Sequence, residues 1–110
     1  MPSKRTLEWR TRQQQYIKEW QEKMSDMRLK AATERWDQDK FEMEIVQLLP
    51  HQKLRDVFVY AKNYIARHKS GKFRTLMFEV YDEIVKHGTV EPSRLNFLMK
   101  TIENVQRKTR

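Results

Sequence analysis

Glycine and proline, the residues that most often end regular secondary structure, are almost missing from this chain. Its 110 residues include two glycines and three prolines. Between these breaks apolar residues return every three or four positions, which is the period of a helix with one buried face, and no strand-like alternation extends beyond a few residues. An all-α fold is therefore predicted, and the length suits one domain rather than two.

Residues 1–49 are expected to form a long N-terminal helical arm. At about 100° per residue, its large apolar side chains fall on one stripe. The members of this stripe are Trp9, Tyr16, Trp20, Met24, Met27 and Ala31. The stripe is interrupted near Trp36, so the arm is either one bent helix or two helices that meet at residues 36–39, with Asp37 or Asp39 capping the second. Pro50 ends the arm.

Residues 50–110 are predicted to form a compact, basic three-helix bundle that belongs to the same structural domain as the arm. Helices are expected at 52–69, 72–87 and 93–108, because Gly71 and Gly88 separate them and Pro92 suits a first helical turn. Each segment places its apolar residues on one face. These faces comprise Leu54, Val57, Phe58, Ala61, Tyr64 and Ile65, then Phe73, Leu76, Met77, Val80 and Ile84, then Leu95, Leu98, Met99, Ile102 and Val105. Amphipathic helices joined by short turns are typical of helical bundles.

The stripe on the arm needs a surface that covers it, because large apolar side chains are unfavourable in water. The arm either folds back onto apolar area of the bundle at Val59, Tyr60, Phe78 and Phe97, or pairs with the same arm of a second chain. Alternating spacings of three and four favour the second arrangement, so a homodimer is predicted. The residues assigned to this interface, or to one with another protein, are Trp9, Tyr16, Trp20, Met24 and Met27.

Positive charge is concentrated in two segments. The net charge is +8, of which residues 1–49 contribute +1 and residues 50–110 contribute +7, and no carboxylate occurs between Asp56 and Glu79. Such clusters favour a polyanionic partner, although a solvated surface that only maintains solubility is the alternative. The predicted nucleic-acid-binding residues are Lys62, Arg67, His68, Lys69, Lys72 and Arg74 in the second half, and Arg5, Arg10 and Arg12 near the N-terminus.

The segment around Gly71 is the best candidate for holding a phosphate. Glycine allows backbone amides to approach an anion closely, and the helix expected to start at residue 72 presents free N–H groups and the positive end of its dipole. The alternative is a polar connection between two helices that binds nothing. Ser70-Gly71-Lys72 lacks the earlier glycine of a nucleotide-binding loop, so this segment does not predict a nucleotide site.

Few residues suggest catalysis. The three histidines are not spaced with each other or with carboxylates as metal ligands are, and the chain has no cysteine. We therefore expect no enzyme activity, no metal and no cofactor. No apolar run approaches the roughly 20 residues that span a membrane, and no secretory signal is recognisable. A cytoplasmic location in a reducing compartment is expected, or a nuclear one if the source is eukaryotic or viral.

These observations together predict a non-catalytic nucleic-acid-binding protein that contacts the phosphate backbone with little sequence preference, with RNA favoured over DNA. Small basic helical proteins of phages and viruses often have this character. The alternative is a helical protein–protein adaptor or a small regulatory subunit, for example within a ribonucleoprotein complex. In that hypothesis the aromatic arm would dock on a protein partner.

Overall fold

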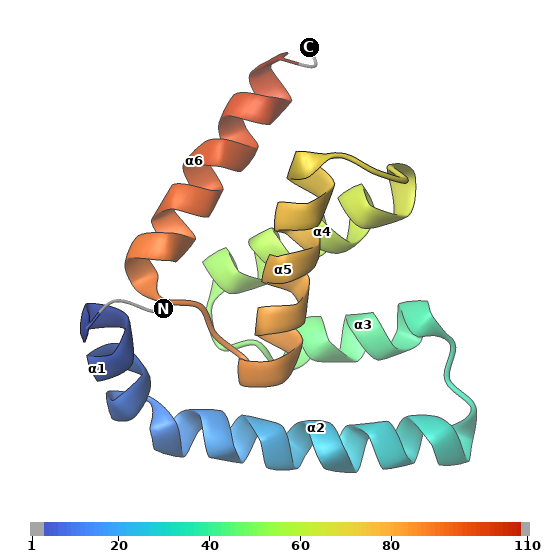
Figure 1. The fold of residues 1–110 in the computed structure, drawn as a ribbon. Helices are drawn as coiled ribbons and strands as arrows, with labels where there is room; N and C mark the ends of the chain where they lie inside the picture. Colours follow the sequence, from blue (N-terminus) through green and yellow to red (C-terminus); the bar gives the residue numbers. More distant parts are fainter. Residues whose placement is uncertain (1–3, 109–110) are drawn as a thin grey trace.

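The structure, a computed structural model, describes the backbone of residues 4–108 and the side chains of residues 7–108. Within residues 4–108 it contains six helices and no strand, which confirms the all-α prediction. The helices are α1 Lys4–Arg12, α2 Gln14–Glu34, α3 Gln38–Leu48, α4 Gln52–Arg67, α5 Lys72–His87 and α6 Pro92–Lys108 (Figure 1). None of these helices is long and apolar enough to cross a membrane.

Local signals in the sequence account for most of the helix ends. Asp37 is the N-cap of α3, and its side chain accepts a hydrogen bond from the backbone N–H of Lys40 at 2.8 Å. Gly88 ends α5 in the left-handed conformation, with φ of 70° and its N–H bonded to the carbonyl of Ile84. Pro92 lies in the first turn of α6, where backbone N–H groups form no hydrogen bond within the helix, so the lack of an N–H in proline costs nothing there.

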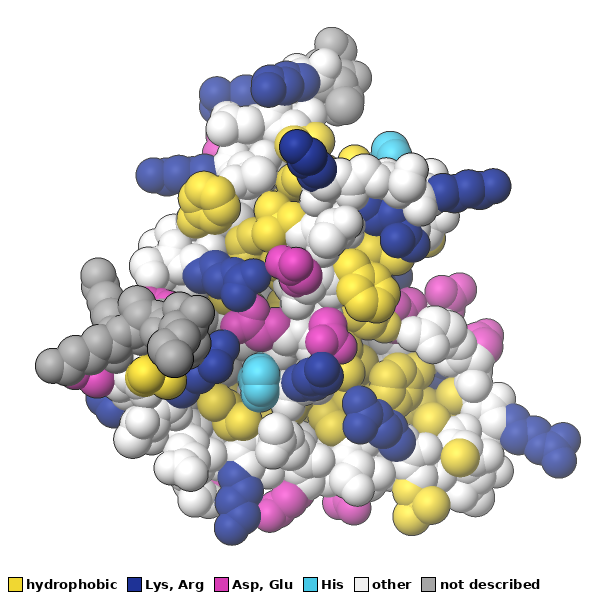
Figure 2. Space-filling view, in the orientation of Figure 1, with side chains coloured by type: hydrophobic (Ala, Val, Ile, Leu, Met, Phe, Trp, Pro, Cys, Tyr) yellow, Lys and Arg dark blue, Asp and Glu magenta, His cyan; other side chains and the backbone are white. Residues whose placement is uncertain are grey.

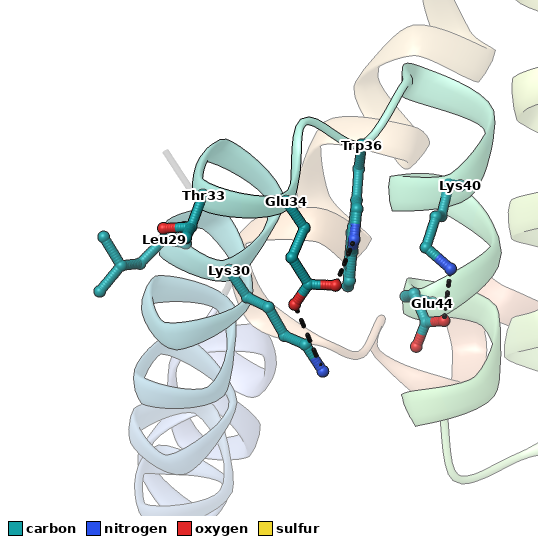
Figure 3. Close-up of polar contacts among 7 residues, drawn as sticks. All are labelled: Leu29, Lys30, Thr33, Glu34, Trp36, Lys40 and Glu44. Atoms are coloured by element: carbon teal, nitrogen blue, oxygen red, sulfur yellow. Dashed lines mark hydrogen bonds and ion pairs between the residues drawn. The ribbon is translucent and has the colours of Figure 1, made fainter.

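The corner between α2 and α3 is organised around Trp36. Arg35 closes α2 in the left-handed conformation, with φ of 56°, and the N–H of Trp36 bonds back to the carbonyl of Ala31. The indole of Trp36 stands between Lys30 of α2 and Lys40 of α3, whose Nζ atoms lie 5.8 and 5.1 Å from the ring centroid (Figure 3). Both lysines also pair with glutamates of their own helix. The chain therefore reverses here in an ordered corner.

The helices do not divide into an arm and a separate three-helix bundle, and this part of the prediction is not confirmed. α4 and α5 pack against each other at the centre, α2 packs on α5, α3 packs on α4, and α6 packs mainly on α4 (Figure 1). Residues of α2 and α3 share one continuous core with residues of α4, α5 and α6. The reason is that α5 is covered from two sides, by α4 and by α2, so that the first half of the chain completes its burial.

Trp20 fixes α2 on the C-terminal end of α5. Its side chain is only 3% exposed, and its Nε1 donates a hydrogen bond to the backbone carbonyl of Val85 at 2.9 Å. The ring covers Gly88 so closely that a Cβ added there would lie 2.2 Å from Cδ2 of the indole. One turn earlier in α2, the hydroxyl of Tyr16 donates to the carbonyl of Gly88 at 2.8 Å.

This packing corrects the assignment of the apolar stripe to a dimer interface. Trp20, Met24 and Met27 are buried in the core of their own chain, and Trp9 and Tyr16 are half-buried. Folding back, the alternative that the sequence left open, is the arrangement in the structure. The docking surface nevertheless differs from the expected one, because Phe78 and Phe97 remain 52% and 62% exposed.

The first helix of the arm ends at a turn that no sequence pattern predicted. At Gln13, where φ is −93° and ψ is 5°, the helix is interrupted, although the N–H of this residue still bonds to the carbonyl of Trp9 at 3.0 Å, as in an α-helix, and also to that of Arg10 at 3.2 Å. As a result α1 stands at a steep angle to α2 (Figure 1). The turn brings Trp9 to a groove whose walls include His51 of the α3–α4 connection and Pro92 of α6.

Replacing Gly88 with alanine should destabilise the protein by about 2–4 kcal/mol, because the new methyl group would overlap the Trp20 ring and the backbone has positive φ. Chemical denaturation monitored by circular dichroism measures this change. In a Trp20→Leu background the same substitution should cost about 1 kcal/mol, which is the backbone contribution alone. Equal costs in the two backgrounds would show that the ring contact is not the cause.

Replacing both Trp20 and Met27 with glutamate should unfold the whole domain, since the two charges would enter the shared core. We expect the far-ultraviolet helical signal to collapse, with no folded remnant of residues 50–110. Wild-type protein should sediment as a monomer. A dimeric wild type whose double variant is a folded monomer would instead restore the arm as an interface between chains.

Candidate nucleic-acid interface

The α4–α5 turn, residues 68–71, lies at one end of the molecule and is exposed along its whole length. Its backbone N–H at His68 bonds to the carbonyl of Tyr64, which ends α4. Gly71 has φ of 119° and ψ of 159°, a region that is essentially restricted to glycine. No atom lies within 4 Å of the place where a Cβ of Gly71 would be, so the approach to the start of α5 is open.

Three cations at this turn have no counter-charge. Arg67, Lys69 and Lys72 are exposed, and none of them forms an ion pair among the residues that the structure describes. Figure 2 shows Lys and Arg side chains over much of this face, whereas most acidic side chains lie below its upper end, which carries the turn and the outer half of α6. The end of the molecule that carries the turn is therefore electropositive.

Arg74 has a structural role at the same turn. Its Nε donates a hydrogen bond to the backbone carbonyl of His68, six residues earlier in the chain. The side chain is half-buried and joins the first turn of α5 to the first residue of the exposed turn. Because this bond ties the two helices across the turn, Arg74 positions His68 as well as adding charge.

A group of aromatic rings continues from the core to the turn, and the sequence patterns assign its members separate roles without predicting that they form one cluster. The rings of Tyr64 and His68 are stacked, with centroids 4.0 Å apart and planes within 17°. Phe73 meets Tyr64 edge-on at 4.8 Å. Tyr60 packs beside both Tyr64 and Phe73. The four-residue spacing of Tyr60, Tyr64 and His68 is the feature of the sequence that could have predicted this cluster, because residues at this spacing share one helix face.

The hydroxyl group of Tyr60 stays neutral under physiological conditions. Burial raises the pKa of Tyr60 above its ordinary value of 10, and the neighbouring Tyr64 raises it further. The rings of this cluster provide flat surfaces next to the cations of the turn. An arrangement of aromatic and basic side chains can hold a base and a phosphate at the same place.

Several predicted residues lie elsewhere. Lys62 is half-buried on another side of α4, where it faces Asp39 and Glu42 of α3 across a shallow depression. Arg10 and Arg12 are exposed on α1, at the opposite end of the molecule from the turn (Figure 1). The side chain of Arg5 lies outside the described residues. The two basic segments of the sequence are thus separate surfaces, and Lys62 belongs to neither.

Among the described residues, the group whose pKa is shifted most lies away from the turn. Burial raises the pKa of Tyr81 well above its usual range, and a hydrogen bond to Glu42, together with the negative charge of that carboxylate, raises it further. Gln38 donates to the same hydroxyl at 3.0 Å. Glu42 is 9% exposed and lies under this tyrosine. Such a satisfied polar pair stabilises the contact between α3 and α5.

The described residues contain no cluster of three or more His, Cys, Asp or Glu side chains that could hold a metal ion. His51 is exposed at the start of α4, and His87 lies in the last turn of α5, so the three histidines are on different elements.

Comparisons of the sequence with protein-family models and with curated proteins, and of the fold with solved structures, find no match. The function of the turn has to be argued from its own residues.

The Tyr81–Glu42 pair should make stability fall in alkaline solution. In the unfolded chain a tyrosine ionises near pH 10, whereas the folded state keeps Tyr81 protonated, so its contribution is complete below pH 10 and is lost as the pH rises further. The loss should approach 1.4 kcal/mol per pH unit for this group. Urea denaturation at pH 8 and pH 10.5 measures it. Tyr81→Phe should be less stable at pH 8 but lose less stability on going to pH 10.5, and parallel losses in the two proteins would contradict this assignment.

Proposed function

We propose that this protein is a non-catalytic nucleic-acid-binding protein, which contacts the phosphate backbone through the α4–α5 turn. The observation that carries the proposal is the presence of three exposed cations, Arg67, Lys69 and Lys72, that no carboxylate neutralises in the described part of the chain. Phosphate groups of nucleic acids attract such clusters strongly, since their binding releases condensed counterions.

The start of α5 adds a second attractive element. Gly71 offers no side chain to cap the helix, and the first turn of α5 contains no acidic residue. Its free N–H groups and the positive end of the helix dipole therefore point toward the same open space as the cations. An anion placed there gains hydrogen bonds that the protein itself does not make.

Little sequence preference is expected. A helix that reads bases in the major groove must present a polar face to the DNA. α5 instead buries Met77, Val80 and Ile84 in the core, and its remaining faces carry Glu79 and Asp82. Contact with the backbone is compatible with this surface and with RNA, whose deep major groove side chains cannot read. We therefore keep RNA as the favoured polymer.

A protein–protein adaptor is the second candidate, and the surface of α6 favours it. Phe97 is 62% exposed. On another side, an open groove of about 540 Å³ separates α4 from α6, with Val57, Tyr60 and Met99 in its walls. The aromatic arm no longer supports this hypothesis, because its stripe is buried. In this hypothesis the partner binds α6 instead.

The proposal predicts strongly salt-dependent binding. Affinity for a generic duplex, measured by fluorescence anisotropy, should fall as salt rises through the physiological range. Replacing Arg67, Lys69 and Lys72 with alanine should weaken binding and make the plot of log affinity against log salt concentration shallower by about 0.9 for each lost contact. The fold should persist, since all three side chains are exposed.

A second triple variant tests whether binding depends on the cations of the turn or only on the net charge of the protein. Lys30, Lys40 and Lys86 are equal in charge to the first set, but each is paired with a carboxylate of its own helix. Replacing them with alanine should leave the salt dependence nearly unchanged. Absence of any binding at low salt would overturn the proposed function, and equal effects of the two triple variants would remove the turn as the site.

A further inference from the structure

We propose that the α4–α5 turn binds single-stranded nucleic acid by stacking one base on the outer face of His68, while Arg67, Lys69 and Lys72 hold the neighbouring phosphates. This inference rests on the proposed function and specifies its ligand. The observation behind it is the series of ring contacts that connects the protein core to the exposed imidazole, edge-to-face between Phe73 and Tyr64 and stacked between Tyr64 and His68.

The inner face of the imidazole is already occupied. Tyr64 lies 4.0 Å from it, nearly parallel, and is itself held by the edge of Phe73 at 4.8 Å. Tyr64 and Phe73 are half-buried and pack against the hydrophobic core. The orientation of His68 is therefore set by rings that cannot move freely, and by the hydrogen bond from Arg74 to its carbonyl.

The outer face of the imidazole is open. His68 is exposed, and among the described residues no ring other than Tyr64 packs on it. A planar aromatic group placed there would extend the series Phe73–Tyr64–His68 by one member. Every nucleobase has a flat π-surface that suits this position, whichever base it is, which agrees with a protein that has little sequence preference.

The charges around the stack favour a nucleotide over an apolar ligand. Lys69 directly follows His68 in the chain, and Arg67 directly precedes it. Lys72 follows Gly71 at the start of α5, where free N–H groups also attract anions. A base on the imidazole would carry its flanking phosphates into this set of unpaired cations.

The stacking geometry selects single strands. Inside a duplex both faces of each base are covered by its neighbours, so a base has to leave the helix before it can stack on a side chain. Single strands and strand ends do not pay this cost. We therefore expect a preference for single-stranded over double-stranded nucleic acid that phosphate contacts alone would not produce.

The test compares probes with the same phosphates but different bases. Fluorescence anisotropy with the full chain would use a thymidine oligonucleotide of about 12 nucleotides, a matching uridine strand, an abasic strand of equal length and a duplex. Both base-bearing strands should bind more tightly than the abasic strand and the duplex. The thymidine and uridine strands distinguish DNA from RNA as the ligand.

Substitutions at the turn complete the experiment. His68→Ala should weaken binding of the base-bearing strands by roughly 5- to 150-fold, the usual effect of losing one base–aromatic stack, and leave the abasic strand unaffected. His68→Phe should retain binding because it keeps a planar ring. Lys69→Ala is the matched control, which should weaken base-bearing and abasic strands equally. Circular dichroism checks that each variant remains folded.

The possible failures are distinguishable. If the protein binds the abasic strand as tightly as the thymidine strand, and His68→Ala changes neither, then the stacking site is wrong while backbone binding stands. If no strand and no duplex binds at low salt, both this inference and the proposed function fail. Loss of binding in His68→Phe equal to that in His68→Ala would also overturn the stacking site.

Discussion

The contact between the Trp20 ring and Gly88 holds the two halves of the chain together. Glycine is the only residue type that fits under this indole at position 88, because the Cβ of any other residue would overlap the ring. Around this contact, Trp20 and Tyr16 donate hydrogen bonds to the carbonyls of Val85 and Gly88, which lie at the C-terminal end of α5 where helical carbonyls lack partners. Side chains of α2 thus satisfy the end of a helix that is 65 or more residues away in the sequence.

The same helix has a contrasting environment at each end. At its C-terminus α5 is covered by α2, and at its N-terminus Gly71 is open, with no atom close to where a side chain would begin. Both glycines have positive φ, but they serve different purposes: one makes room for a tryptophan, and the other leaves the helix start uncapped. α2 holds α5 at its C-terminal end, and α4 packs on α5 along its length. The turn at the N-terminal end of α5 is therefore attached to a well-packed helix. Binding residues on loops commonly depend on such a scaffold.

The aromatic stack links this support to the surface. Tyr64 and Phe73 belong to the margin of the core, and His68 is the first ring beyond it. Arg74 secures the backbone at the same place through its bond to the carbonyl of His68. Under the proposed function, a ligand would lose less free energy in ordering this site than it would on a flexible loop. This preorganisation distinguishes the turn from the cluster on α1, where Arg10 and Arg12 are exposed without a comparable stack.

The sequence by itself determined the helices of the second half to within two residues, limited the cap of the third helix to Asp37 or Asp39, and indicated the apolar faces of the helices of the second half and the uneven distribution of charge. These features depend on neighbours at most four residues apart, which is the range over which helical periodicity and capping act. Only the tertiary structure decided that α2 folds back on α5, that the chain turns at Gln13, that Lys62 faces α3, and that the two basic segments lie at opposite ends. An apolar stripe in the sequence indicates that some surface must cover it but does not identify that surface, because burial of apolar area is favourable against any apolar neighbour. The surface that covers the stripe is instead determined by shape, because Gly88 leaves room for the indole of Trp20.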